Sequence, residues 1–370
     1  MILITSFQGH CQPIRPGCYQ MDQYLPLLFS KKVGICTNHT GLIESVHLVD
    51  SLIDLNINVI KVFSPEHGFN GKKDAGQEIT NQTMSEYEIV SLYGNKKQPS
   101  RADMQGLEIM VFDIQDVGAR FYTYTSTMTY VMTACAIAGI PLIILDRPNP
   151  IGNIIGGPVL ARNCKSFVGM HPVPIAHGLT VGEYAYMINE ENWLDDELYC
   201  DLKIIKIKNW THSSIYKIGI KPSPNLPDQK SIQCYPSLCL FEQTICSVGR
   251  GTEKAFQHIG HPSYPDRSYY FLPRSQEGAS NPKYENQKCY GINYSDSLIN
   301  GFSIQPLIYF YDKMGKPGDF FGDYFHLLAG NHTLQDQIES NMSVGEIEKS
   351  WAKDLSKYKK LRKQYLLYPE

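Results

Sequence analysis

The stretch from Leu107 to Thr127, LEIMVFDIQDVGARFYTYTST, constrains the fold more than any other part of the chain. It opens with a nearly continuous apolar run over 107–112, which is typical of a strand buried on both faces. Two acids, an amide, an arginine and several tyrosines follow within a few residues. Because ligands bind outside the carboxyl ends of the strands in open α/β sheets, this exit predicts part of a functional site.

Four further apolar segments have the pattern of buried strands. In the first part of the chain these strands are separated by segments whose apolar residues recur at helical spacing. We predict strands at 32–36, 58–63, 141–145 and 202–207, and helices at 23–29, 42–53 and 127–138. Alternating strands and helices predict parallel strands joined by right-handed crossovers. We therefore expect an α/β fold in which helices cover both faces of a parallel sheet.

Polar side chains follow four of these strands at the point where each strand ends. Parallel strands present their carboxyl ends at the same edge of a sheet, so these side chains are expected to converge there. A helix cap, a turn or a buried ion pair would explain any one of them, but four such exits together favour a functional site. The residues are Asn38, His39, Glu66, His67, Asp113, Asp116 and Asp146.

Several classes of protein are disfavoured by the composition and by missing motifs. The chain has 34 basic and 37 acidic residues, and its formal charge of -3 argues against a nucleic-acid surface. No GxGxxG follows the first strand and no GK[ST] occurs, which disfavours a dinucleotide or phosphate-loop site. No apolar run approaches the roughly 20 residues of a membrane helix. The ten cysteines form no CxxC pair and the histidines are dispersed, so we expect no metal and no cofactor.

Later segments add polar loops and a second, smaller unit. The excursion over 70–101 is predicted to be a long functional loop without secondary structure. Thr180 and Glu183 form the pattern of a capping box, so Glu183 is better explained as a helix cap than as a catalyst. From about Gly260 the chain becomes rich in Pro, Tyr, Asn and Ser, and it ends in an amphipathic helix over 347–366. We assign 1–22 to an extension, 23–260 to the main domain and 261–370 to a smaller α+β domain that completes the cleft.

Eight motifs occur in an order that resembles one known family. Together they resemble the bacterial exo-β-N-acetylmuramidase family of peptidoglycan recycling, long catalogued as a domain of unknown function. The resemblance covers residues 20 to 368. The motifs are TNHTG, SPEHGFNG, FDIQDVGARFYTYTSTM, LDRPNPIG, HGLTVGE, SPNLP, SVGRGT and RKQYLLY.

The resemblance implies a Rossmann-like N-terminal domain, a smaller C-terminal domain and a cleft between them. It implies removal of N-acetylmuramic acid from the non-reducing end of peptidoglycan fragments, so the expected partners are such saccharides or muropeptides. It also implies a periplasmic or extracellular location, although the first residues lack the basic and apolar regions of a signal peptide.

Hydrolysis of a glycosidic bond needs a protonated carboxyl group near the leaving oxygen and usually a second carboxylate near the anomeric carbon. Glu66 is our candidate for the acid, because apolar neighbours would raise its pKa. His67 would orient it or relay a proton. The alternative for Glu66 is a structural ion pair with Arg120 or Arg147. Whether the reaction retains or inverts the anomeric centre depends on the separation of the carboxyl groups and stays open.

We choose Asp116 as the second catalytic group, because Asp113 lies closer to the buried strand and would instead orient Arg120 or a backbone amide. Tyr122 or Tyr124 is an alternative nucleophile. Arg120 and Arg250 suit the lactyl carboxylate of muramic acid, because a guanidinium binds a carboxylate through two hydrogen bonds. The remaining predicted substrate contacts are Asn38, His39, Asp113, Gln115, Tyr122, Tyr124, Asp146, His177 and Asn225.

Two other functions remain open on the residues alone. A non-catalytic muropeptide-binding protein would need the aromatic, arginine and amide side chains but not Glu66. A metal-assisted hydrolase would use Asp113 and Asp116 with His39 or His67 as ligands. The sheet itself does not choose between them, because doubly wound sheets carry many chemistries.

Overall fold

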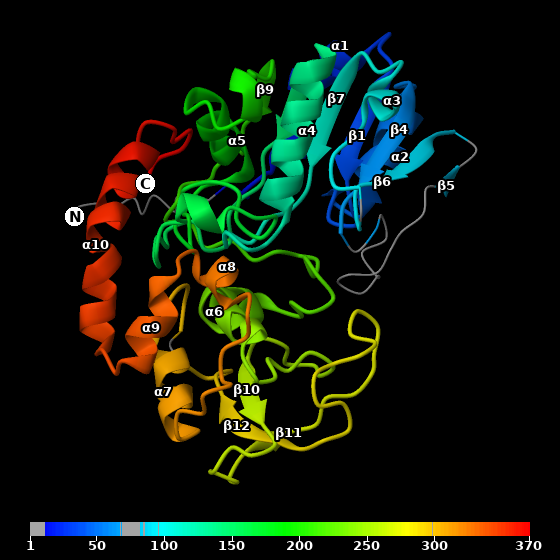
Figure 1. Cartoon of the computed structure of the whole chain (residues 1–370). Coiled ribbons are helices and arrows are strands. Elements are labelled where there is room, and N and C mark those ends of the chain that lie inside the picture. Colours follow the sequence, from blue (N-terminus) through cyan, green and yellow to red (C-terminus); the bar gives the residue numbers. More distant parts are fainter. Residues whose placement is uncertain (1–11, 67, 69–81, 84–85, 95, 298) are drawn as a thin grey trace, which may run out of the picture.

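The computed structural model describes residues 12–66, 68, 82–83, 86–94, 96–297 and 299–370. Its largest element is a seven-stranded sheet in which all neighbouring strands are parallel except β5 and β6 (Figure 1). In spatial order the strands are β5 (Gln82–Thr83), β6 (Glu88–Ser91), β4 (Val59–Ser64), β1 (Val33–Thr37), β7 (Ile109–Asp113), β8 (Leu142–Leu145) and β9 (Leu202–Ile205).

The strand order reverses between β1 and β7. If only the six parallel strands are numbered along the chain, their spatial order is 3-2-1-4-5-6, which is an order of doubly wound sheets. Thr37 at the end of β1 lies opposite Asp113 at the end of β7. The five predicted strands are therefore confirmed, each to within two residues at either end, and two of the predicted polar exits lie side by side.

Both faces of the sheet are buried, which explains the apolar runs in the sequence. Successive residues of β7 alternate between two hydrophobic clusters: Met110 and Phe112 belong to one, and Ile109 and Val111 to the other. The first cluster includes side chains of α4 (Tyr124–Ala138) and α5 (Val181–Glu190), and the second those of α1 (Met21–Leu28) and α2 (Leu48–Asp54). The expected α/β fold, with helices on both faces of a parallel sheet, is confirmed.

Two predictions about local structure were wrong. The helix predicted over 42–53 starts only at Leu48, after a short hairpin of β2 (Leu42–Ile43) and β3 (Val46–His47), because the His47 ring accepts a hydrogen bond from the backbone of Val49 and caps α2. The excursion over 70–101 contains β6, which pairs with β4, and reaches the start of α3 (Arg101–Met104). Polar flanks conceal the four-residue β6 in the sequence. Residues 70–81, 84–85 and 95 of this excursion lie outside the described residues.

The second part of the chain is smaller and mixes helices with an antiparallel sheet. The sheet order is β10 (His258–His261), β12 (Cys289–Asn293) and β11 (Tyr270–Phe271). The predicted division at residue 260 stays a prediction, and β10 spans that position. None of the described helices is long and apolar enough to cross a membrane. The other elements are η1 (Gly17–Tyr19), η2 (Arg162–Cys164), η3 (Asp195–Glu197), α6 (Gln229–Leu238), η4 (Cys239–Gln243), α7 (Gln305–Lys313), α8 (Phe325–Ala329), α9 (Thr333–Glu339) and α10 (Val344–Arg362).

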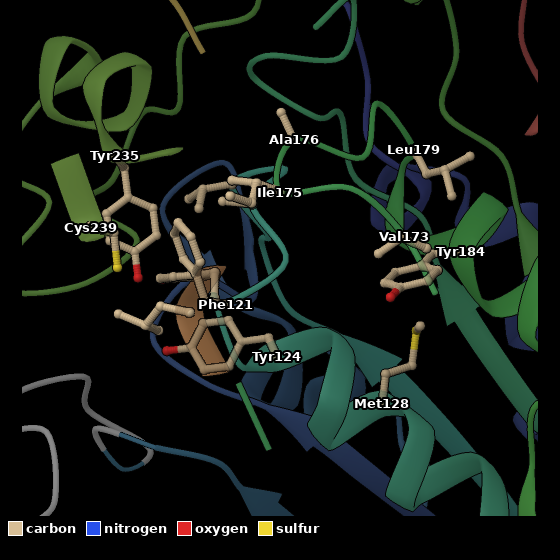
Figure 2. Packing of buried hydrophobic residues seen from close by; sticks show 14 of the residues in the cluster. Phe121, Tyr124, Met128, Val173, Ile175, Ala176, Leu179, Tyr184, Tyr235 and Cys239 are labelled. Atoms are coloured by element: carbon tan, nitrogen blue, oxygen red, sulfur yellow. The ribbon is translucent and has the colours of Figure 1, made fainter. Parts of the chain in front are cut away.

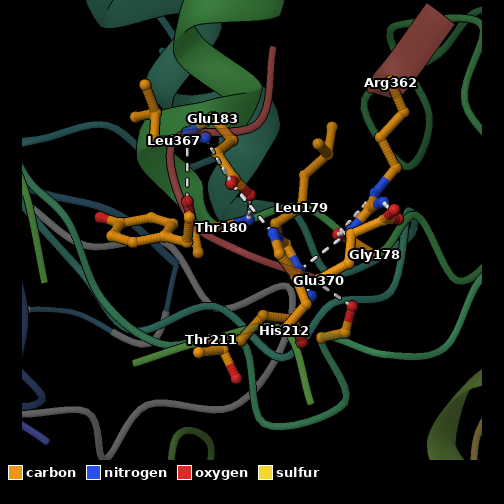
Figure 3. Close-up of polar contacts among 12 residues, drawn as sticks. Gly178, Leu179, Thr180, Glu183, Thr211, His212, Arg362, Leu367 and Glu370 are labelled. Carbon is orange, nitrogen blue, oxygen red and sulfur yellow. Dashed lines mark hydrogen bonds and ion pairs between the residues drawn. The ribbon is translucent and has the colours of Figure 1, made fainter. Parts of the chain in front are cut away.

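The last helix, α10, runs along one side of the molecule and returns the chain to the first part (Figure 1). The Tyr358 hydroxyl donates to the carbonyl of His177 at 2.6 Å. Arg362 is buried and donates from Nε and Nη2 to the carbonyl of Gly178 at 2.9 and 2.7 Å (Figure 3). The predicted amphipathic helix is thus present, and its apolar face is packed against the rest of the chain.

Asp146 and Glu183 fasten the C-terminal residues to the sheet. Asp146 Oδ1 accepts from the backbone of Gly182, while its Oδ2 accepts from the hydroxyls of Thr180 and Tyr368 at 2.8 and 2.5 Å. Glu183 completes the predicted capping box of α5 with Thr180. Its Oε1 also accepts from the backbone of Leu367 (Figure 3). Asp146 is therefore a structural residue, and the expectation that it binds substrate is corrected.

Asp146 predicts a pH dependence of stability. Burial raises its pKa from 3.8 to about 7 and outweighs the hydrogen bond from Tyr368. The unfolded chain loses this proton near pH 4 while the folded protein keeps it, so the contribution of Asp146 to stability is present at low pH and is lost as pH rises towards 7. In Asp146→Asn, the unfolding free energy should lose the part of its pH dependence that comes from this proton. Denaturant titration at several pH values between 4 and 7 measures it. An unchanged pH dependence would contradict the prediction.

Candidate active site

A cavity of about 250 Å³ lies between the two parts of the chain. Its volume is below the roughly 300–1,000 Å³ of drug-sized sites, so it suits a ligand of the size of one sugar unit. The lining includes residues that follow β4 and β7 of the large sheet, residues in and around η4, and residues of the loop after β9. The lining residues are Glu66, Phe121, Tyr122, Thr123, Tyr124, Val168, Ser223, Asn225, Leu226, Tyr235, Cys239, Glu242, Gln243, Arg250, Phe256 and Leu328.

Glu66 presents an oriented carboxyl group to this cavity. It follows β4 by two residues and is half-buried. Its Oε1 accepts from the Tyr93 hydroxyl and its Oε2 from the Thr123 hydroxyl, each at 2.8 Å. Thr123 is the N-cap residue of α4, so the carboxyl group also lies at the positive end of that helix. The alternative ion pair of Glu66 with Arg120 or Arg147 is absent from the described residues.

Aromatic rings form one wall of the cavity. Tyr122 packs edge-on against Tyr124 and Tyr235, with ring centres 4.8 and 6.0 Å apart. Phe121 packs edge-on against Tyr235, and Figure 2 shows these two rings with Tyr124. Burial raises the pKa of both Tyr122 and Tyr124, and the nearby Glu66 carboxylate raises that of Tyr124 further. Both phenols therefore stay protonated at neutral pH. A protonated phenol is a weak nucleophile, so the geometry does not favour the tyrosine alternative.

Arg250 and Glu242 face the cavity as an ion pair. Arg250 Nε and Nη2 donate to the two Glu242 oxygens at 2.8–3.1 Å, and both side chains are 27% exposed. Burial acts to lower the pKa of Arg250, but Glu242 outweighs it and the pKa is raised. Nη1 makes no hydrogen bond within the described part of the chain, so it remains available to a ligand.

The loop that carries Arg250 is fixed by His258. The His258 Nε2 lies 3.0 Å from the Thr252 hydroxyl, and its ring stacks on Phe271 with the centres 3.8 Å apart. Gly249 has a φ of +79°, and a Cβ there would lie 2.1 Å from His258 Nε2. Only glycine fits this turn, which explains one of the closely spaced glycines of the SVGRGT motif.

Hydrogen bonds hold the loop over 222–227 both to the segment just before α4 and to the segment around Gly278. The Tyr122 hydroxyl donates to the carbonyl of Pro222 at 2.7 Å. Asn225 is buried, and its Nδ2 donates to the carbonyl of Gly278 in the second part at 2.7 Å. Five predicted site residues thus meet at one cavity: Glu66, Tyr122, Tyr124, Asn225 and Arg250.

Two domains of one protein family match consecutive parts of the chain. The exo-beta-N-acetylmuramidase NamZ N-terminal domain matches residues 33–230, and the C-terminal domain of the same family matches residues 233–368. The chain belongs to the exo-beta-N-acetylmuramidase NamZ family. The cavity described above is formed where these two domains meet.

Individual relatives agree with this family. The peptidoglycan beta-N-acetylmuramidase NamZ of Bacillus subtilis (strain 168) is 35% identical over 376 residues, which cover 94% of this chain and 89% of the relative. A crystal structure of a DUF1343 family protein from Bacteroides fragilis NCTC 9343 has 42% identity and a TM-score of 0.89, covering 97% of this chain and 100% of that one. A second such protein from the same organism has 26% identity and a TM-score of 0.82, covering 96% and 99%. The predicted family is confirmed.

Several residues predicted to bind substrate in this NamZ-family chain instead belong to its scaffold. Asp113 is fully buried and pairs with Arg147, from which it accepts hydrogen bonds of 2.6 and 2.8 Å. The expectation that Asp113 orients Arg120 was therefore wrong. Arg120 is also buried, and it donates to the carbonyls of Pro158, Val173 and Leu328 at 2.9–3.0 Å. Its placement corrects the expectation that it binds a substrate carboxylate.

The remaining predicted residues that the structure describes do not line the cavity. Asp116 is buried, accepts from the backbone of Gly118 at 2.7 Å and lies 3.6 Å from His177 Nε2. Its role as the second catalytic group stays a prediction. Gln115 donates to two backbone carbonyls, and Asn38 accepts from Thr40. The His39 ring contacts the carbonyl of Lys221, and His67 lies outside the described residues.

Sequence reasoning missed four residues that shape the site: Tyr93, Thr123, Tyr235 and Glu242. The TYTST run at 123–127 was recognised as polar, but nothing in it marks Thr123 as the donor to Glu66. Glu242 follows no strand, so the polar-exit pattern does not detect it. It reaches the cavity only because the second domain packs over the first.

Arg120 and Arg250 should respond differently to the same substitution. The single nitrogen of Arg120→Lys cannot reach carbonyls that two guanidinium nitrogens now bind, so buried acceptors lose their donor and the free energy of unfolding should fall by about 1–3 kcal/mol. Arg250→Lys should leave stability nearly unchanged and reduce substrate affinity. Denaturant titration measures the first effect, with the exposed Arg101→Lys as the matched control. A stable Arg120→Lys variant with impaired substrate binding would restore Arg120 to the site.

Proposed function

We propose that this protein is a glycoside hydrolase that releases N-acetylmuramic acid from the non-reducing end of peptidoglycan fragments. Membership of the exo-beta-N-acetylmuramidase NamZ family supports this activity. The name of the Bacillus subtilis relative supports peptidoglycan as the substrate. The structural observation that carries the proposal is Glu66, whose carboxyl group is held by two hydroxyl donors at a cavity of the size of one sugar. From the family resemblance alone, we also propose that the protein works in the periplasm or outside the cell.

Glu66 is the proposed general acid. Its proton passes to the glycosidic oxygen, the bond from that oxygen to the anomeric carbon breaks, and a water molecule supplies the hydroxyl group of the released sugar. The other proton of that water returns to the carboxylate of Glu66, directly or through solvent, and restores the acid. The hydroxyls of Tyr93 and Thr123 hold the carboxyl group in place, which lowers the entropic cost of the proton transfer. This chemistry requires no metal ion.

Arg250 is the proposed contact for the lactyl carboxylate. Glu242 binds Nε and Nη2, so Nη1 is the guanidinium nitrogen that is left for a ligand. The charged residues of the lining are Glu66, Glu242 and Arg250. Arg250 is therefore the cation of this lining, and it is the group suited to a negatively charged substrate.

The role of Glu66 predicts a large loss of turnover. Glu66→Gln keeps the shape of the side chain and removes the titrating proton. Because general acid catalysis contributes about 10²–10⁴-fold, kcat on a β-linked N-acetylmuramide should fall by a factor in that range, with KM little changed. Tyr93→Phe, which removes one of the two donors, should cause a smaller loss.

The measurement is release of reducing sugar, with and without a chelator. Chelator should leave wild-type activity unchanged, and loss of activity would instead support the metal-assisted alternative. Unchanged kcat in Glu66→Gln would remove Glu66 from the chemistry and make Asp116→Asn the next variant. A wild type that binds muramyl sugars but never cleaves them would favour the binding protein.

If Arg250 binds the lactyl carboxylate, replacing it should reduce the preference of the protein for N-acetylmuramic acid over N-acetylglucosamine. Free N-acetylmuramic acid should inhibit the wild type more strongly than N-acetylglucosamine, because only the former has a lactyl carboxylate. Arg250→Ala should reduce this preference by about tenfold or more, since a hydrogen bond to a charged group contributes about 1.5–3 kcal/mol. Inhibition constants for the two sugars measure the ratio. An unchanged preference would exclude Arg250 as the carboxylate contact.

A further inference from the structure

A second and larger hollow lies along α10. It has a volume of about 1130 Å³ and is walled by α10, by α9 with the residues before it, and by the segment over 158–162. It shares no lining residue with the active-site cavity. Its volume exceeds the roughly 300–1,000 Å³ of small-molecule sites, so it suits an extended ligand. We call it the α10 groove.

Aromatic and amide side chains line the α10 groove. Trp193 is half-buried and is held by stacking on His171, with ring centres 5.2 Å apart. Trp351 lies on α10 at the floor of the groove, where it is buried and packs edge-on against Phe302, so Trp193 is the ring that a ligand can reach. Gln337 and Gln364 add amide groups that both donate and accept hydrogen bonds. Rings that cover apolar C–H faces, together with amides that bind hydroxyls, form a lining suited to a chain of sugars.

The charges of the α10 groove favour an anionic ligand. Lys357 pairs with Asp354 at 2.9 Å, and Glu191 accepts from the Tyr365 hydroxyl. Arg162 and Lys360 are exposed and form no ion pair within the part of the chain that the structure describes. The Tyr365 hydroxyl leaves the charge of Glu191 uncompensated, so the three basic and two acidic residues of the lining give the groove one net positive charge. A glycan that carries carboxylates matches both the aromatic lining and these cations.

We propose that the α10 groove binds a glycan strand of peptidoglycan, separately from the sugar that is cleaved. This inference rests on the proposed function, which makes peptidoglycan the substrate. Its ligand class is a polymer of N-acetylated sugars with carboxylate substituents. The groove would hold the enzyme on the polymer and so raise the local concentration of chain ends at the cavity.

The structure couples the α10 groove to the cavity through shared segments. The backbone of Ala161 donates to the carbonyl of Gly330 at 2.7 Å and joins two walls of the groove. Arg120 donates both to Pro158, a groove residue, and to Leu328, a cavity residue. A strand in the groove would therefore be held at a fixed position relative to Glu66.

The test compares insoluble peptidoglycan with a small substrate. The variants are Trp193→Ala and the double charge reversal Arg162→Glu with Lys360→Glu, and Lys353→Glu on the exposed face of α10 is the matched control. Co-sedimentation with purified sacculi, stripped of covalently attached anionic polymers, is measured in a Glu66→Gln background to prevent digestion. Kinetics on a small β-linked N-acetylmuramide are measured with Glu66 intact.

We expect the groove variants to bind sacculi about tenfold or more weakly, while kcat/KM on the small substrate stays unchanged. The melting temperature should stay unchanged in the charge reversal and should fall in Trp193→Ala, because that ring stacks on His171. Lys353→Glu should behave as wild type in both assays. Equal binding of sacculi by the groove variants and the control would overturn the proposal, as would binding only to unstripped walls. If the wild type never cleaves the small substrate but groove-dependent sedimentation persists, the groove stands and the proposed hydrolase activity fails.

Discussion

The buried guanidinium of Arg120 is the interaction on which the arrangement of the two domains depends. Its hydrogen bonds to Pro158 and Val173 lie within the first domain, and the bond to Leu328 reaches the second. Burial lowers the pKa of Arg120 to about 10, so the charge is held at a cost that the three carbonyls offset. Gly330 makes room for it, because a Cβ there would lie 2.3 Å from Nη2. Leu328 lines the cavity, so this contact also fixes the position of the cavity wall.

The C-terminal helix forms a second connection between the domains. Tyr358 and Arg362 bond to the loop before α5, and Tyr368 reaches Asp146 at the end of β8. The chain therefore returns to the parallel sheet after completing the second domain. A cavity between two domains keeps its dimensions only if the domains do not shift, and these contacts at the end of the chain oppose such a shift.

Five charged residues near the sheet edge and the cavity fall into two groups that differ in access to ligands. Asp113 and Arg147 are buried and neutralise each other, so neither is available to a substrate. Glu66, Glu242 and Arg250 are half-buried and line the cavity. A buried ion pair supports the fold only while both partners remain, whereas a partly exposed carboxyl group can exchange a proton with a ligand. The second group is the one suited to catalysis.

The sequence alone determined five strands of the first domain and the edge of the sheet at which polar groups gather. Apolar runs and helical spacing are local signals, so five strands, the capping box of α5 and the amphipathic α10 were predictable. Glu66 was also predictable, because its motif follows a buried strand. Tertiary structure decided which polar exits face the cavity. Asp113 and Asp146 stand at the same edge as Glu66 but are covered by Arg147 and Tyr368, which lie 34 and 222 residues away in the chain. The partner of a buried charge depends on which segments pack over it, and no local pattern in the sequence specifies that packing.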